Sequence, residues 1–180
     1  MTIAGVILCG GKSRRMGVDK AGLTFEGRTW LEVAAHTLTT TGVQTILYSG
    51  RPDLPGGIAD PTPDTGPAGG IAAALHHLSG RCDQALFVPV DMPELPPEAL
   101  TLLAAHPGAG AFFAGDPLPF ALRLGPAVAE TAQAFVTTAE RSPSVRVLLA
   151  HLGCMEIPAP PGLVLRNLNT PEDAATLKSS

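Results

Sequence analysis

Two continuous apolar runs, residues 3–9 and 85–90, mark the most deeply buried strands that the sequence predicts, the second of which begins at Gln84. Runs of this length without polar alternation are typical of parallel strands covered on both faces. Between them, apolar side chains in residues 29–41 recur at helical spacing, and Gly42 ends that helix. The same patterns predict further strands over residues 23–25, 43–48, 111–113, 120–124, 155–157 and 164–165, and further helices over residues 71–78, 96–105, 126–136, 144–152 and after Thr170.

This alternation of strands and helices predicts an α/β fold. We expect a three-layer sandwich, with a mostly parallel twisted sheet and helices on both faces. The 180 residues show no repeat or low-complexity linker, so we expect a single domain over residues 1–180. Ligands of such sheets bind at the carboxyl ends of the strands, near a topological switch point. The loop after residues 3–9 and Asp91, after residues 84–90, should therefore lie at the same edge.

Composition narrows the class of function. The chain is 45% hydrophobic and 16% charged with a net charge of −4, which argues against a nucleic-acid-binding surface. We see no apolar run of 18 residues and no charged leader, so we expect neither a membrane span nor a signal peptide. Cys9, Cys82 and Cys154 form no CxxC motif and suit reduced thiols of a cytoplasmic protein.

A cationic loop stands out against this acidic background. Four of the 12 Lys and Arg residues lie in residues 12–20, directly after Gly10-Gly11. Glycines let a ligand approach the backbone N–H groups and long cations reach over it, so the loop predicts an anion site; a solvated basic turn is the alternative. A P-loop would need its first glycine at position 6, which is Val6, and the spacing of a dinucleotide-binding fingerprint is also missing.

Later stretches add candidates for the same edge. Asp91 follows the apolar strand directly, where an unpaired carboxylate is costly, so it is either a metal ligand or a hydrogen-bond anchor, or else a cap for the turn that follows. Mg²⁺ needs only one or two protein carboxylates when substrate phosphates complete its shell. Residues 65–70 form either a helix-entry turn or a second site of backbone N–H groups, and Asp60 is either a specificity carboxylate or a turn residue.

The loop also carries a family resemblance. The run Leu8-Cys9-Gly10-Gly11-Lys12-Ser13-Arg14-Arg15-Met16-Gly17-Val18-Asp19-Lys20 resembles the signature L-x-G-G-x-S-x-R-M-G-x-D-K of the molybdenum cofactor guanylyltransferases, which belong to the nucleotidyltransferase superfamily. In order along the chain, residues 66–71, 89–93 and 167–173 resemble the family's G-P-L-A-G-[IM], P-C-D-T-P and N-[IV]-N-T-P-E-[DE]. The resemblance spans residues 3 to about 177 and implies a Rossmann-like nucleotidyltransferase fold.

The resemblance implies roles for particular residues. Nucleotide binding would fall to backbone groups of the first loop and to later positions: Leu8, Cys9, Gly10, Gly11, Lys20, Asp60, Gly70 and Asp91. Lys20 would hold the GTP phosphates with Arg15 supporting the charge, and Asp91 would ligate Mg²⁺; these three would be the catalytic residues. Asn169 would lie near the metal and the second substrate. The chain departs from the family pattern at Tyr48 or Ser49 (often Asn), at Met92 (usually Thr) and at Cys9 (commonly Ala).

The implied reaction is attack by the terminal phosphate of molybdopterin on the α-phosphorus of GTP, with pyrophosphate leaving. Its implied partners are GTP, molybdopterin and, transiently, enzymes that make or receive the cofactor, with Mg²⁺ as the metal. A phosphate monoester has a second pKa of about 6, so the nucleophile needs no general base. Residues 114–120 should shape the acceptor pocket. Alternatives are a related nucleotidyltransferase with another nucleotide or acceptor, such as a molybdopterin cytidylyltransferase, and a non-catalytic nucleotide-sensing module.

Overall fold

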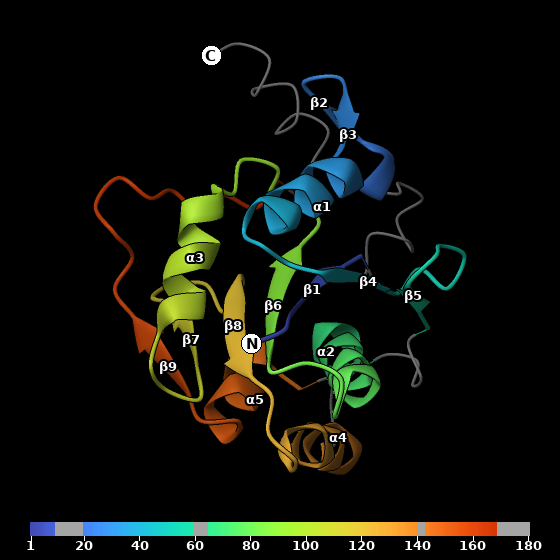
Figure 1. The fold of residues 1–180 in the computed structure, drawn as a ribbon, viewed down its shortest axis with the longest axis vertical. Coiled ribbons are helices and arrows are strands. Elements are labelled where there is room, and N and C mark those ends of the chain that lie inside the picture. Colours follow the sequence, from blue (N-terminus) through green and yellow to red (C-terminus); the bar gives the residue numbers. More distant parts are fainter. Residues whose placement is uncertain (10–19, 60–64, 140–142, 169–180) are drawn as a thin grey trace.

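The computed structural model describes residues 1–9, 20–59, 65–139 and 143–168. Within these residues seven strands form one sheet in the order β5-β4-β1-β6-β8-β7-β9, and β2 pairs with β3 in a small hairpin (Figure 1). The strands are β1 (Ile3–Leu8), β2 (Thr24–Phe25), β3 (Arg28–Thr29), β4 (Thr45–Ser49), β5 (Gly57–Ile58), β6 (Gln84–Pro89), β7 (Gly110–Phe113), β8 (Phe120–Arg123) and β9 (Cys154–Ile157).

The sheet is mostly parallel, as the sequence predicts. β1 pairs in parallel with β4 and β6, β4 with β5, and β7 with β9. β8 is inserted between β6 and β7 and runs antiparallel to both. Six strands of the described sheet therefore point their carboxyl ends to one edge, which we call the carboxyl edge.

Helices cover both faces of the sheet. They are α1 (Trp30–Thr40), α2 (Gly66–Leu78), α3 (Pro97–Ala105), α4 (Val128–Thr138) and α5 (Val145–His151), with a short 3₁₀ turn η2 (Lys20–Gly22). One buried cluster joins α2, α4 and α5 to the sheet, and a second joins α1 and α3 to its other face. In Figure 1 the helices α2, α4 and α5 lie toward the bottom, and α1 lies toward the top. The predicted three-layer α/β architecture is thus confirmed.

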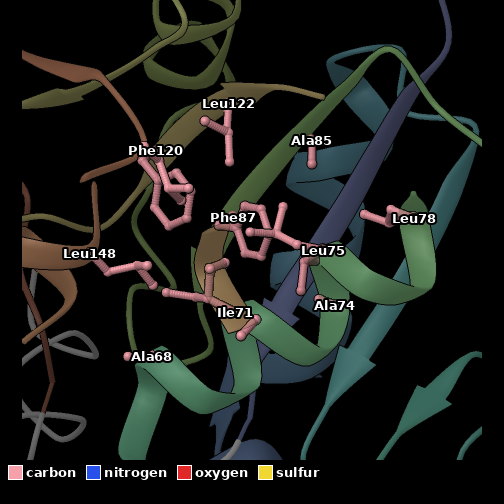
Figure 2. Packing of buried hydrophobic residues seen from close by; sticks show 14 of the residues in the cluster. Ala68, Ile71, Ala74, Leu75, Leu78, Ala85, Phe87, Phe120, Leu122 and Leu148 are labelled. Carbon is pink, nitrogen blue, oxygen red and sulfur yellow. The ribbon is translucent and has the colours of Figure 1, made fainter. Parts of the chain in front are cut away.

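The first cluster has an aromatic pair at its centre. Phe87 of β6 and Phe120 of β8 stack with ring centroids 4.4 Å apart and an interplanar angle of 9°, and both are fully buried. Figure 2 shows Ile71 and Leu75 of α2 pointing toward these rings, with Leu148 of α5 closing the cluster. All six residues of β6 are buried, which explains why this strand reads as a continuous apolar run.

The second cluster anchors α1 against the opposite face. Trp30 and Leu38 on this helix are fully buried. The helix begins in a capping box: the Thr29 hydroxyl accepts from the Glu32 backbone N–H, and the Glu32 carboxylate accepts from the Thr29 backbone N–H at 2.7 Å. These hydrogen bonds from Thr29 hold the pKa of Glu32 below its ordinary value. The prediction of a helix over residues 29–41 is confirmed.

Several predicted boundaries were wrong. α2 begins at Gly66 and not at residue 71, so the glycine-rich stretch is helix and not an entry turn. A Cβ on Gly69 would overlap the Thr65 hydroxyl, so the close approach of that side chain requires glycine there. The short strand β5 was missed, and residues 164–165 form no strand. The predicted terminal helix lies outside the described residues, and the single domain over residues 1–180 stays a prediction.

Candidate nucleotide-transfer site

The switch point of the sheet lies between β1 and β6. The two strands are parallel neighbours in a register that pairs Leu8 with Pro89. The Val90 backbone N–H donates to the Leu8 carbonyl at 3.3 Å, which keeps the strands together past their last ladder bond. The chain leaves both strands at the carboxyl edge, so the glycine-rich loop after β1 and the acidic turn after β6 start side by side. This is the position where open α/β sheets bind their ligands.

Lys20 and Asp91 meet at this edge. The Lys20 ammonium nitrogen lies 3.2 Å from Oδ2 of Asp91, and the two side chains are 14% and 21% exposed. Lys20 opens η2, whose next residue, Ala21, is buried in the cluster under α1. Partial burial removes much of the water that screens an ordinary surface pair. The structure therefore brings together two of the three residues that the sequence predicts as catalytic.

Leu168 joins this pair through its backbone, and sequence reasoning missed it. Its N–H donates to the Asp91 carbonyl at 2.9 Å, and its own carbonyl accepts from the Lys20 ammonium at 3.1 Å. Its side chain is fully buried in the cluster that holds α1 and α3. The hydrogen bonds of Leu168 to the two charged residues come from its backbone, so its residue type carried no signal. Its place inside the motif of residues 167–173 was the available clue.

Cys9 and Ser49 lie at the carboxyl ends of two neighbouring strands. The Cys9 backbone N–H donates to the Ser49 carbonyl at 3.0 Å, and the Cys9 thiol donates to the Ile7 carbonyl at 3.6 Å. The Ser49 residue is only 2% exposed. At this departure from the family pattern, the backbone of Ser49 thus supports the strand end from which the first loop leaves.

The amino end of α2 also faces the carboxyl edge. α2 connects β5 to β6, two parallel strands, so it runs back across the sheet from the carboxyl edge to the amino edge. Gly70, the fifth residue of this helix, follows its first turn directly and is buried. A helix amino terminus carries partial positive charge and unpaired N–H groups, which favour phosphate. The predicted nucleotide-binding residue Gly70 therefore lies in an element whose dipole suits an anion at this edge.

Five of the predicted site residues lie outside the described residues: Gly10, Gly11, Arg15, Asp60 and Asn169.

Within the described residues, no group of three or more His, Cys, Asp or Glu side chains could hold a metal ion. Helices long and apolar enough to cross a membrane are likewise absent from the described part of the chain. Cys154 is a thiol whose pKa burial raises to about 12, so at neutral pH it is protonated.

Comparison with known proteins places this geometry in a family. The family model for the MobA-like NTP transferase domain matches residues 5–152, which include most of β1, Lys20, α2 and Asp91. This chain belongs to the MobA-like NTP transferase family. It is therefore a nucleotidyltransferase by family, in agreement with the resemblance seen in its sequence.

Individual relatives cover nearly the whole MobA-like chain. A molybdenum cofactor guanylyltransferase from Xanthomonas euvesicatoria pv. vesicatoria is 38% identical over 176 residues, spanning 96% of this chain and 93% of the relative. The crystal structure of molybdopterin-guanine dinucleotide biosynthesis protein A from Archaeoglobus fulgidus matches with a TM-score of 0.68 and 20% identity, covering 97% and 96% of the two chains. A Mycobacterium tuberculosis protein in complex with manganese matches with a TM-score of 0.67 and 19% identity over all of both chains. At these identities the two structures show the fold alone.

Proposed function

We propose that this chain transfers GMP from GTP to the terminal phosphate of molybdopterin, releasing pyrophosphate. The observation that carries the proposal is the contact of Lys20 with Asp91 at the carboxyl edge, 3.2 Å apart and largely shielded from water. The Xanthomonas relative, a molybdenum cofactor guanylyltransferase that aligns along nearly the full chain, supports the choice of donor and acceptor. A membrane surface or nucleic acid plays no part in this proposal.

The chemistry requires two polyanions to meet in line. The acceptor phosphate is largely ionised at neutral pH, so the enzyme's task is to position the reactants and offset their charge. The Lys20 ammonium is oriented by two acceptors, the Asp91 carboxylate and the Leu168 carbonyl. A cation held this way is oriented before the substrate arrives, and we assign to Lys20 the binding of the GTP phosphates. Arg15 would add positive charge beside the leaving pyrophosphate.

Asp91 suits Mg²⁺ as the protein ligand. Its carboxylate follows a fully buried strand, is only 21% exposed and lies beside the proposed phosphate-binding cation. Mg²⁺ is commonly held by one or two carboxylates together with substrate phosphates, which fits this arrangement. When bound, the ion would neutralise phosphate charge and polarise the phosphorus under attack. Asp91 would orient it, and the divalent metal named for the Mycobacterium structure is compatible with the assignment.

The remaining contacts are proposals of the same kind. Backbone groups of the first loop would line the guanine nucleotide, with α2 contributing its amino end; the residues are Leu8, Cys9, Gly10, Gly11, Asp60 and Gly70. Asn169, one residue after the Leu168 backbone that contacts both charged groups, would face the metal and molybdopterin. We place the reaction in the cytoplasm, where thiols such as Cys154 stay reduced.

Pyrophosphate release tests the proposal. The enzyme is incubated with GTP and Mg²⁺, with and without molybdopterin, and the guanine dinucleotide product is identified by mass. We expect release that depends on both molybdopterin and Mg²⁺. GTP binding without pyrophosphate release would refute the proposal and favour a nucleotide-sensing module. Parallel assays with CTP, ATP and UTP decide the base, because higher turnover with CTP would identify a cytidylyltransferase instead.

A further inference from the structure

The segment between β7 and β8, residues 114–119, is fastened to its surroundings at three places. The Ala114 N–H donates to the Ile157 carbonyl at the end of β9, at 2.8 Å. The Arg146 guanidinium of α5 donates to the Gly115 carbonyl at 3.1 Å, and Gly115 has a φ of +100°, which disfavours other residues. Arg146 is itself held by an ion pair with Glu156. β7 ends at the carboxyl edge, so this segment, which we call the acceptor loop, starts on the same side as Asp91.

The third attachment is the carboxylate of Asp116, which uses both of its oxygens. Oδ1 accepts from the Leu118 backbone N–H at 3.0 Å, which shapes the turn of the acceptor loop. Oδ2 accepts from the side-chain amide of Asn167 at 2.7 Å, a short bond across 51 residues of sequence. A carboxylate acceptor makes this bond stronger than one between neutral groups. Asp116 therefore fixes the shape of the loop and also its place against the carboxy-terminal segment.

Asn167 continues directly into the site. The next residue, Leu168, donates its N–H to the Asp91 carbonyl and accepts from the Lys20 ammonium, while its buried side chain locks the segment in the core. A single peptide bond thus separates the contact with the acceptor loop from the contacts with the charged pair. The position of the loop relative to Lys20 and Asp91 is set by this short path.

We propose that Asp116 is a positioning residue for the phosphorylated acceptor, acting through Asn167 to hold the acceptor loop at a fixed distance from the charged pair. The inference rests on the proposed function and deepens it by separating acceptor placement from GTP binding. Neither Asp116 nor its bond is part of the nucleotide contacts assigned above. Loss of the bond should therefore raise KM for molybdopterin while leaving GTP affinity unchanged.

An exchange of the two side chains tests the pair. Asp116→Ala removes the carboxylate that accepts from both Leu118 and Asn167, and it should raise KM for molybdopterin roughly three- to tenfold. Asn167→Asp should be at least as damaging, because two carboxylates then face each other. In the double variant Asp116→Asn/Asn167→Asp, the new Asn can still accept from Leu118 and can donate to the new Asp. We expect KM to return to within about threefold of wild type, which an Asn167 that binds the substrate directly would not allow.

Asp83→Asn is the matched control, because Asp83 also accepts two hydrogen bonds but lies before β6, at the opposite edge. It should leave KM for molybdopterin unchanged. An unchanged KM in Asp116→Ala, or a double variant as impaired as Asn167→Asp, overturns the inference while wild-type activity upholds the proposed function. A wild-type protein that neither binds nor turns over molybdopterin refutes both. A parallel rise in the dissociation constant for GTP also overturns it, since the effect would then not be specific to the acceptor.

Discussion

The ammonium nitrogen of Lys20 lies 3.2 Å from a carboxylate oxygen of Asp91, although 71 residues separate them in the chain. The first residue opens the turn η2 and the second follows β6, so the contact exists only when β1 and β6 are paired. A pair this shielded interacts more strongly than an exposed one, so either group moves away readily only when a new partner replaces this contact. A substrate phosphate is suited to replace Asp91 beside Lys20, and a metal ion is suited to replace Lys20 beside Asp91.

Asp91→Ala should abolish most turnover without unfolding the protein. The variant removes the carboxylate that we assign to Mg²⁺, and we expect kcat to fall on the order of 10²- to 10³-fold, as for loss of a key electrostatic group. Lys20 keeps its bond to the Leu168 carbonyl, so the free energy of unfolding should drop by only about 1 kcal/mol. Pyrophosphate release and urea unfolding measure the two quantities. Asp53→Ala, which removes an exposed carboxylate paired with Arg51, is the control, and wild-type turnover in Asp91→Ala would contradict the metal assignment.

Lys20 variants should separate charge from shape. Lys20→Ala is expected to weaken GTP binding roughly 10- to 100-fold, the range for losing a hydrogen-bonded charge. Lys20→Arg keeps the charge but replaces a compact ammonium by a planar fork, so it should recover part of the affinity and little of the turnover. Calorimetric titration with GTP and Mg²⁺ gives the affinities. An unchanged GTP affinity in Lys20→Ala would remove Lys20 from the phosphate site.

Phe87→Ala should cost about 3–5 kcal/mol of unfolding free energy, because it leaves a cavity and removes the stacking with Phe120. The denaturation midpoint should fall while the denaturant slope stays the same. Leu102→Ala, on the exposed side of α3 with 48% of its surface accessible, should change stability by less than about 0.5 kcal/mol. Similar losses in both variants would mean that the aromatic pair is not central to the core.

Acid should remove a stabilising contribution from Asp83. Hydrogen bonds from the backbone N–H and hydroxyl of Thr2 hold the pKa of Asp83 below its ordinary value of 3.8. A carboxyl whose folded pKa is depressed stabilises the fold above its ordinary pKa, and this contribution is lost as the pH falls through the folded value. The difference in unfolding free energy between wild type and Asp83→Asn should therefore be largest above about pH 4 and shrink below it. Urea unfolding across pH 2–7 measures it, and a difference that grows on acidification would contradict the assignment.

The sequence predicted the elements with strong local signals. β6 is an almost entirely apolar segment because all six of its residues are buried. α1 carries both its apolar stripe and its capping box. It failed where pairing partners decide: β5 has two residues and exists through its ladder with β4, whereas residues 164–165 look similar and pair with nothing in the described sheet. The early start of α2 was hidden by its glycines, which lower helix propensity but allow Thr65 to pack closely.

Part of the candidate site was predictable from its side chains. Asp91 was predicted from a carboxylate at a strand end, whereas the family resemblance singled out Lys20 among the cations of the loop, and the structure places the two side chains together. Leu168 was not predictable, because its contribution is a carbonyl and an N–H that every non-proline residue possesses. The contact of Asp116 with Asn167 was equally hidden. It joins residues 51 positions apart, and Asp116 lies in the connection that leads from β7 into its antiparallel neighbour β8.

The position of Leu168 also has a consequence for biosynthesis on the ribosome. Lys20 bonds to a carbonyl that lies 148 residues further along the chain, after the last strand of the described sheet. A nascent chain that has emerged through α3 already contains both charged residues and the strands that pair them, yet it lacks the carbonyl that orients the ammonium group. Phosphate-binding geometry would then be acquired only after every described strand of the sheet has been made, and a messenger truncated before codon 168 would yield a sheet without a finished site.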